Sequence, residues 1–170
     1  MSNPDSPGFS HLDDQGVARM VDVSGKAITR RVARASCRVE LSADTVASLS
    51  SLPKGDAIAV ARIAGIQGAK RTSDWIPLCH PLALDRVEVE IEPVEGGVRL
   101  RSEVVTTGRT GAEMEALAAC SAAALALYDM VKAVERGAVI QDLRLEHKSG
   151  GRGGEWDRDS VSGAKLEEEA

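Results

Sequence analysis

The sequence predicts one α+β domain in which an antiparallel sheet packs against helices. Two observations lead to this prediction: several short stretches alternate apolar with polar residues, and segments that begin with helix-capping residues lie between them. The order of the elements is strand, two helices, hairpin, long helix and strand, and no internal repeat is visible. This order resembles the split βαβ arrangement of ferredoxin-like domains.

The first strand and the two helices after it have clear local signals. From Arg31 to Leu41, apolar and polar side chains alternate with the two-residue period of a half-buried strand. Ser42 then fits the N-cap of a short helix that runs toward Leu52, and Asp56 fits the N-cap of a second helix that ends near residues 70–71. The basic end of this second helix suits the helix dipole.

The clearest pattern is a hairpin. Residues 87–92 alternate apolar side chains with glutamates, and residues 98–104 alternate apolar or small side chains with Arg99, Arg101 and Glu103. The segment Glu95-Gly96-Gly97 provides the turn between them. Because the outer faces of the two strands carry opposite charges, we expect Glu and Arg side chains to pair across the strands.

A long helix and a last strand complete the domain. The segment Thr110-Gly111-Ala112-Glu113 fits the capping-box pattern S/T-x-x-E at the start of a helix. Strong helix formers continue from there to Gly137, which is a typical C-terminal stop, so one uninterrupted helix is expected. Beyond it, Val139, Leu143 and Leu145 predict a strand.

Composition bounds the class of protein. With 170 residues, of which 43% are hydrophobic, we expect a single domain over residues 20–156 between a mobile N-terminal segment, 1–19, and a mobile acidic tail, 157–170. Aromatics are only 2%, so the core must be built from small aliphatic side chains, which favour close approach of helices or subunits. A net charge of -5 argues against binding nucleic acid through its phosphates. Three widely spaced cysteines and no apolar run of bilayer length favour a cytoplasmic protein without disulfides or membrane spans.

The loop of residues 75–82 is the first candidate for chemistry. Two X-Pro steps force extended backbone and make the loop stiff, and it carries Cys79 and His80 side by side. A stiff loop with these side chains is suited to hold a donor or acceptor beside a ligand. The alternative is that Leu78 and Leu82 plug the core and that His80 has no role in binding. Zinc is disfavoured, because neighbouring residues rarely both ligate and no CxxC or HxxxH partner exists, and no metal site is expected.

The long helix carries the second group of candidates. Glu113 and Glu115 lie in its first turns, and Asp129 and Lys132 lie three residues apart near its end, where neighbouring apolar residues predict partial burial. Glu115 and Asp129 are 14 residues apart, which is about 21 Å along a helix axis, so they can share one small site only if a second subunit contributes. The alternative is an ordinary helix, with acids at its positive end and a local ion pair.

Cations form the third group. The segment 148–154 combines Lys148 and Arg152 with four glycines, which suits phosphate, although a flexible Gly-rich tail is an equal alternative. Lys54, Lys70 and Lys132 would complete an anion pocket if the fold gathers them. Neither a P-loop nor a Rossmann glycine pattern is present.

Six segments in the same order resemble one family, the cyclic pyranopterin monophosphate synthases. The resemblance extends from about Phe9 to Trp156. The segments are residues 20–24 as MVDVS, 61–67 as ARIAGIQ, 76–82 as IPLCHPL, 111–117 as GAEMEAL, 128–133 as YDMVKA and 148–151 as KSGG. Val131 and Arg152 depart from the family, where Cys and Lys are common at these positions.

The resemblance implies an activity. It implies a lyase of molybdenum cofactor biosynthesis that converts 3',8-cyclo-7,8-dihydroguanosine 5'-triphosphate to cyclic pyranopterin monophosphate and pyrophosphate. It also implies a homohexamer, a trimer of dimers, with active sites at dimer interfaces. No cofactor is implied, and assistance by a divalent cation such as Mg²⁺ is left open. The alternatives are a non-catalytic oligomeric nucleotide-binding module and a structural partner of the preceding radical enzyme.

The resemblance also implies site residues. Asp129 is the catalytic aspartate, and we pair it with Lys132 as acid and base. Lys54 belongs to the catalytic group and, with Lys70, Lys148 and Arg152, to the expected phosphate clamp. The expected substrate-binding residues are Leu78, Cys79, His80, Glu113, Met114, Glu115, Lys70 and Lys148.

Overall fold

The computed structural model of the chain describes residues 15–159. Most of the segments predicted to be mobile, 1–19 and 157–170, therefore lies outside the described residues. Asp157 is described as part of a short strand, and the structural description continues to Asp159.

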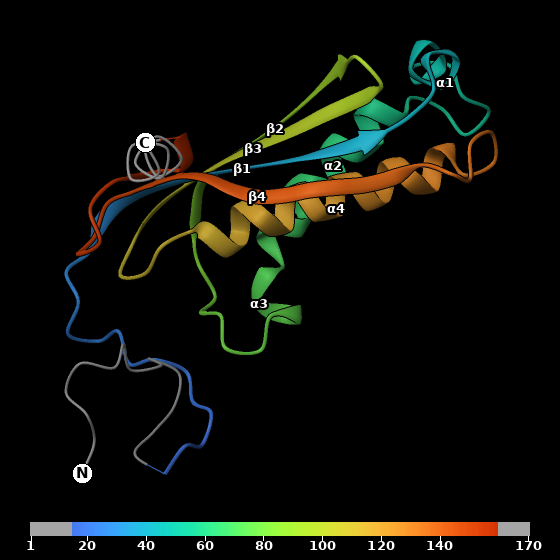
Figure 1. Ribbon diagram of the computed structural model, residues 1–170. Helices are drawn as coiled ribbons and strands as arrows, with labels where there is room; N and C mark the ends of the chain where they lie inside the picture. Colours follow the sequence, from blue (N-terminus) through green and yellow to red (C-terminus); the bar gives the residue numbers. More distant parts are fainter. Residues whose placement is uncertain (1–14, 160–170) are drawn as a thin grey trace, which may run out of the picture.

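The described chain forms one five-stranded antiparallel sheet with helices against one face (Figure 1). The strand order is β2-β3-β1-β4-β5, so β3 lies between β1 and β2, and β1 lies between β3 and β4. The predicted α+β class and antiparallel sheet are confirmed. The order is compatible with split βαβ units, and the ferredoxin-like assignment stays a prediction. The strands are β1 (Thr29–Glu40), β2 (Leu84–Val94), β3 (Gly97–Gly108), β4 (Val139–Ser149) and β5 (Trp156–Asp157).

Four helices connect these strands. They are α1 (Ala43–Ser48), α2 (Ala57–Lys70), α3 (Thr72–Trp75) and α4 (Glu113–Val131). Both predicted N-caps are confirmed: Ser42 accepts a hydrogen bond from the backbone N–H of Thr45, and Asp56 accepts one from that of Ala59. The single turn of α3 was not predicted from the sequence.

The predicted limits of the long helix are wrong at both ends. Helix α4 begins at Glu113 with Ala112 as N-cap, so Thr110 makes no capping box. Arg31 donates to the carbonyls of Gly108 and Arg109, both at 3.0 Å, and this holds the chain against β1 just before the helix.

At its other end, α4 stops at Val131 rather than at Gly137. Here the Glu135 carboxylate accepts hydrogen bonds from the backbone N–H and the hydroxyl of Ser42, at 3.0 and 2.9 Å. These contacts with α1 replace the last predicted helical turn.

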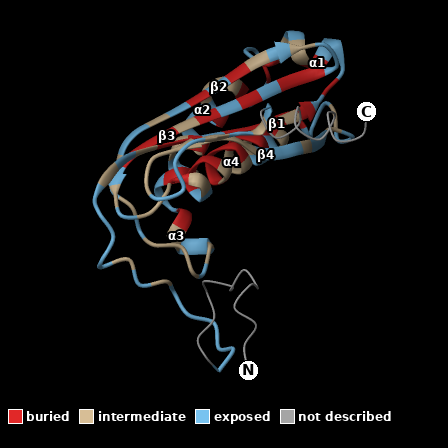
Figure 2. Cartoon of the chain, turned by 60° about the vertical axis from the view of Figure 1, so that its left-hand side comes forward, coloured by how far each residue is buried: buried red, intermediate tan, exposed pale blue. Residues whose placement is uncertain are grey.

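Small residues let α2 and α4 approach closely over the buried face of the sheet (Figure 2). A Cβ atom added at Gly68 would lie 2.5 Å from the Ala122 Cβ and 2.9 Å from the Ala118 carbonyl oxygen. By length and composition, α4 would also suit a membrane span, but 56% of the relevant window is buried in this fold. Its apolar character therefore has a structural explanation as the core helix.

The hairpin confirms the predicted cross-strand charge pairing. Glu92 lies opposite Arg99 in the register and accepts ion pairs from Arg99 at 3.6 Å and from Arg101 at 3.0 Å. These side chains are almost half exposed, so the pairs fix the register of the hairpin more than they stabilise the fold.

Replacing Gly68 by Ala should lower the free energy of unfolding. The added methyl overpacks the interface of α2 and α4 by about 1–3 kcal/mol, while the better helix propensity of Ala returns about 0.5–1 kcal/mol. The expected net loss is on the order of 1 kcal/mol in urea unfolding. Gly137→Ala is the control, since its Cβ meets nothing within 4 Å. Equal unfolding midpoints for the two variants would contradict the close-packing explanation.

Candidate active site

One group of predicted residues meets at the N-terminal end of α4. The loop after α3 places the Cys79 thiol 3.6 Å from Oε1 of Glu115, and the backbone N–H of Cys79 donates to the carbonyl of Ile76. A cavity of about 420 Å³ opens beside this contact. It is lined by Leu78, Cys79, His80, Glu113 and Met114, together with Val21, Val23, Lys26, Ile76, Thr110 and Gly111. Only Leu82 of this loop packs against the core as a plug would.

The carboxyl group of Glu115 lies in an unusual environment. Its residue is 2% exposed, and its Oε2 has no hydrogen-bond partner among the described residues. Burial raises the pKa of Glu115 above its ordinary value, because the charged form loses its water. Burial, and then the negative charge of Glu115, raise the pKa of the Cys79 thiol to about 11. Cys79 is therefore a neutral thiol at neutral pH and is suited to binding rather than to nucleophilic attack.

A second hollow, of about 530 Å³, adjoins the first and shares Lys26, Thr110 and Gly111 with it. Its lining combines four cationic side chains with glycine backbone, which is the chemistry of a phosphate site. The cationic side chains belong to Lys26, Arg31, Arg109 and Arg152. Lys148 lies nearby, because its ammonium group approaches the backbone of Gly153.

Of these four cations, only Arg152 was predicted. The sequence carries no local signal for Lys26, Arg31 and Arg109, since Arg109 lies 78 residues after Arg31 along the chain. Only the pairing of β1 with β3 brings Arg31 beside Arg109.

A third group lies at the other end of α4. The Asp129 carboxylate contacts Nζ of Lys132 at 2.6 Å and Nζ of Lys54 at 3.1 Å, and Lys54 also donates to the backbone carbonyl of Asp129 at 2.8 Å. The hydrogen bond from Lys132, followed by that from Lys54, lowers the pKa of Asp129 below its ordinary value. The expected partial burial is wrong: the side chains of Asp129 and Lys132 are 57% and 49% exposed.

The group around Glu115 and the group around Asp129 lie at opposite ends of α4, so the length of the helix separates them (Figure 1). Gly68 faces Ala118 while Gly65 faces Ala123, so α2 and α4 run antiparallel. Lys70 at the end of α2 therefore lies toward the Glu115 end. Within one chain, the structure brings together neither Glu115 and Asp129 nor all the predicted lysines.

Comparisons with known proteins agree with the sequence pattern. Residues 20–151 match the MoaC family. A cyclic pyranopterin monophosphate synthase of Streptomyces avermitilis is 55% identical over 91% of this chain and 92% of its own length. One from Streptomyces coelicolor is also 55% identical, over 88% of this chain and 89% of its own length. A protein of Mycobacterium bovis with the name cyclic pyranopterin monophosphate synthase 2 is 54% identical, over 88% and 91% respectively.

The raised pKa of Cys79 predicts slow alkylation by iodoacetamide. Because the thiolate is the reactive form, the rate at Cys79 should rise by about ninefold from pH 9 to pH 10, whereas a thiol with the ordinary pKa of 9.0 would gain only about twofold. Glu115→Gln should speed alkylation at pH 8, since it removes the nearby negative charge. Peptide mass spectrometry distinguishes Cys79 from the buried Cys37 and Cys120. A rate that rises only about twofold from pH 9 to pH 10 would contradict the raised pKa.

Proposed function

The chain belongs to the MoaC family, and from this membership we propose that it catalyses the formation of cyclic pyranopterin monophosphate in molybdenum cofactor biosynthesis. The proposed substrate is 3',8-cyclo-7,8-dihydroguanosine 5'-triphosphate, and pyrophosphate is the second product, so the enzyme is a lyase. The observation that carries the proposal is the family match, which includes Cys79, Glu115 and Asp129 within residues 20–151. The names of relatives more than 50% identical support it.

The two adjoining hollows suit the two ends of such a substrate. We assign the purine-derived ring to the cavity beside Cys79 and His80, where carboxyl, thiol and imidazole groups offer donors and acceptors. We assign the triphosphate to the hollow lined by cations, with Lys148 at its edge. Pyrophosphate release builds negative charge on the leaving group, and these cations would stabilise that charge.

The proton transfers are assigned to the exposed group at the C-terminal end of α4. Lys132 and Lys54 keep Asp129 ionised, so its carboxylate can accept a proton. Their ammonium groups can donate protons to a leaving oxygen or a ring nitrogen. No resident cofactor is part of this proposal, and a Mg²⁺ ion that arrives with the phosphates would be held by substrate oxygens and water.

Joining the two ends of α4 in one site requires more than one subunit. Glu115 and Asp129 lie about 21 Å apart along α4, which is too far for both to contact one small substrate. We therefore propose that α4 of a partner subunit brings its Asp129 end to the Glu115 end of this chain. A homohexamer built as a trimer of dimers, located in the cytoplasm, would supply such interfaces. Exposed apolar side chains on the two long helices, Val60, Ile63 and Leu125, support an interface there.

Replacing Lys132 by Ala should abolish turnover and leave the oligomer intact. Loss of a positioned proton donor lowers the rate by about 10²–10⁴-fold. Pyrophosphate release from the cyclic dihydroguanosine triphosphate measures it, and Arg136→Ala is the control for loss of an exposed cation. Near-normal release from Lys132→Ala would remove this residue from the mechanism. Binding of the substrate by the unaltered protein without product would instead favour a nucleotide-binding module.

Mixing two inactive variants tests the shared site. Glu115→Gln and Asp129→Asn should each be inactive alone. In mixed oligomers, about a quarter of the interface sites receive both unaltered residues, one from each chain, if subunits combine at random. Activity should therefore rise after the variants are unfolded and refolded together, and not after simple mixing without exchange. No recovery in verified mixed oligomers would mean that one chain supplies both residues.

A further inference from the structure

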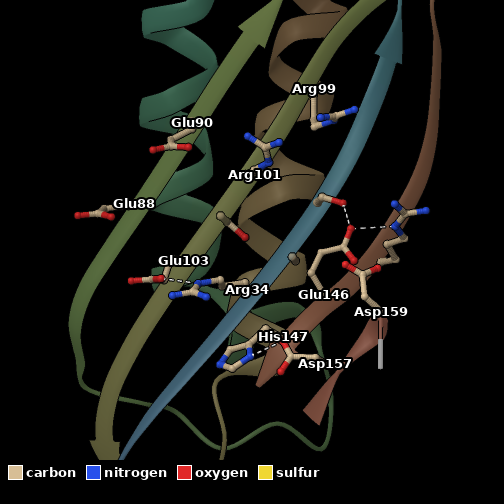
Figure 3. Close-up of a pocket in the computed structure, with 14 residues that line it drawn as sticks. Arg34, Glu88, Glu90, Arg99, Arg101, Glu103, Glu146, His147, Asp157 and Asp159 are labelled. Carbon is tan, nitrogen blue, oxygen red and sulfur yellow. Dashed lines mark hydrogen bonds and ion pairs between the residues drawn. The ribbon is translucent and has the colours of Figure 1, made fainter. Parts of the chain in front are cut away.

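Three side chains with metal-binding atoms converge where β5 joins β4. His147 and Asp157 are direct partners in the antiparallel register, and Nδ1 of His147 lies 2.8 Å from Oδ1 of Asp157 (Figure 3). Glu155 lies two residues before Asp157, immediately before β5 begins. Oε1 of Glu155 lies 4.0 Å from the same Nδ1.

We propose that His147, Glu155 and Asp157 bind a divalent transition-metal ion, and that zinc is the ion they fit best. Their ligand atoms all lie within 4.8 Å of one another. Zinc binds imidazole nitrogen and carboxylate oxygen at about 2.0–2.2 Å in tetrahedral geometry, which requires ligand atoms about 3.4 Å apart. The separations of 2.8 and 4.0 Å lie on either side of that value. Mg²⁺ and Ca²⁺ prefer all-oxygen sites, so the imidazole favours zinc.

The surrounding charges leave room for a cation. The imidazole is largely shielded, with 12% of its side chain exposed, and this fixes one ligand in place. Arg34 lies opposite His147 in the register, but it is paired with Glu103 at 2.6 Å. Arg144 and Arg158 are both paired with Glu146. Asp159 adds a further carboxylate to the hollow that contains His147.

The three ligands surround the base of the Gly-rich segment. Seven residues, 148–154, separate His147 from Glu155, and four of them are glycine. Among the described residues, two register pairs join β5 to β4, and Arg158 after β5 also donates to the Leu145 carbonyl of β4. A metal ion that bridges the ends of this segment would restrict it at small entropic cost, because the loop is short and already closed. The segment carries Arg152, so the ion would act as a structural clamp behind the cationic hollow.

This site is distinct from the proposed active site. His147 and Lys148 are adjacent in β4 and point to opposite sides of the sheet. His147 lines the hollow on the face away from α2 and α4 (Figure 3). The inference therefore does not rest on the catalytic assignment, although the sequence predicted no metal site.

Zinc titration of the untagged full chain, after treatment with a chelator, tests the proposal. Calorimetry should give one zinc ion per chain. His147→Ala and Glu155→Gln should each weaken zinc binding by at least about tenfold, since even changes outside the ligand shell reach that size. Glu155 is 70% exposed, so its substitution should leave the fold intact. Glu88→Gln, an exposed carboxylate in the same hollow, is the matched control and should bind zinc normally.

A Cys79→Ser variant distinguishes zinc bound at the His147 site from zinc bound by the Cys79 thiol and the neighbouring His80. Zinc binding that disappears in Cys79→Ser and persists in His147→Ala would overturn the proposal, as would equal affinity in Glu155→Gln and the unaltered chain.

The clamp on the Gly-rich segment is tested by a separate measurement. Zinc should slow tryptic cleavage after Arg152 several-fold in the unaltered chain and not in Glu155→Gln, because cleavage requires the segment to open. Cleavage that zinc leaves unchanged in both would contradict a clamp.

Discussion

The close approach of α2 and α4 is the constraint on which the rest of the structure depends. Helical glycines of α2 face the alanine-rich surface of α4, and at Gly65 an added Cβ would already lie 3.0 Å from the Ala119 carbonyl oxygen. With so few aromatic side chains, close-packed small residues must provide the dispersion contacts of the core. Such an interface permits little sliding, so it fixes where the two ends of α4 lie. The functional groups at both ends take their positions from this packing.

The two ends of α4 place two carboxyl groups in opposite environments. Glu115 is buried against Cys79, which raises its pKa, whereas Asp129 lies exposed between two lysines, which lower its pKa. One helix thus carries one carboxyl group whose pKa is raised by burial and another whose pKa is lowered by neighbouring lysines. Oε2 of Glu115 has no hydrogen-bond partner among the described residues, whereas the exposed Asp129 carboxylate already accepts hydrogen bonds from two lysines. Within one chain, the fold thus separates the group that we propose for binding from the group that we propose for proton transfer.

Local patterns predicted the elements well and their ends less well. The four predicted strands and the caps Ser42 and Asp56 were confirmed because they depend on alternation and on hydrogen bonds between near neighbours, whereas the two-residue β5 was not predicted. The limits of α4 were wrong because distant side chains decide them: Arg31 holds the chain before the helix, and Glu135 after it accepts hydrogen bonds from Ser42, the N-cap of α1. The stiff loop and the acids of α4 were named as candidates from the sequence. The cationic hollow lined by Lys26, Arg31 and Arg109 could not be predicted, since the pairing of β1 with β3 brings Arg31 beside Arg109.

The Gly-rich segment shows why the site needs both freedom and restraint in its backbone. A Cβ at Gly150 would clash with the backbone of Arg30, and φ is +93° there, so only glycine lets the segment pass so close to β1. This passage brings Arg152 to the same hollow as Arg31. Because glycine has the most backbone freedom, ordering this segment costs much conformational entropy. The two-residue β5 supplies few strand hydrogen bonds to offset that cost. The contact of Asp157 with His147 therefore restrains the segment that positions Arg152, and the geometry of the cationic hollow depends on how firmly β5 is held to β4.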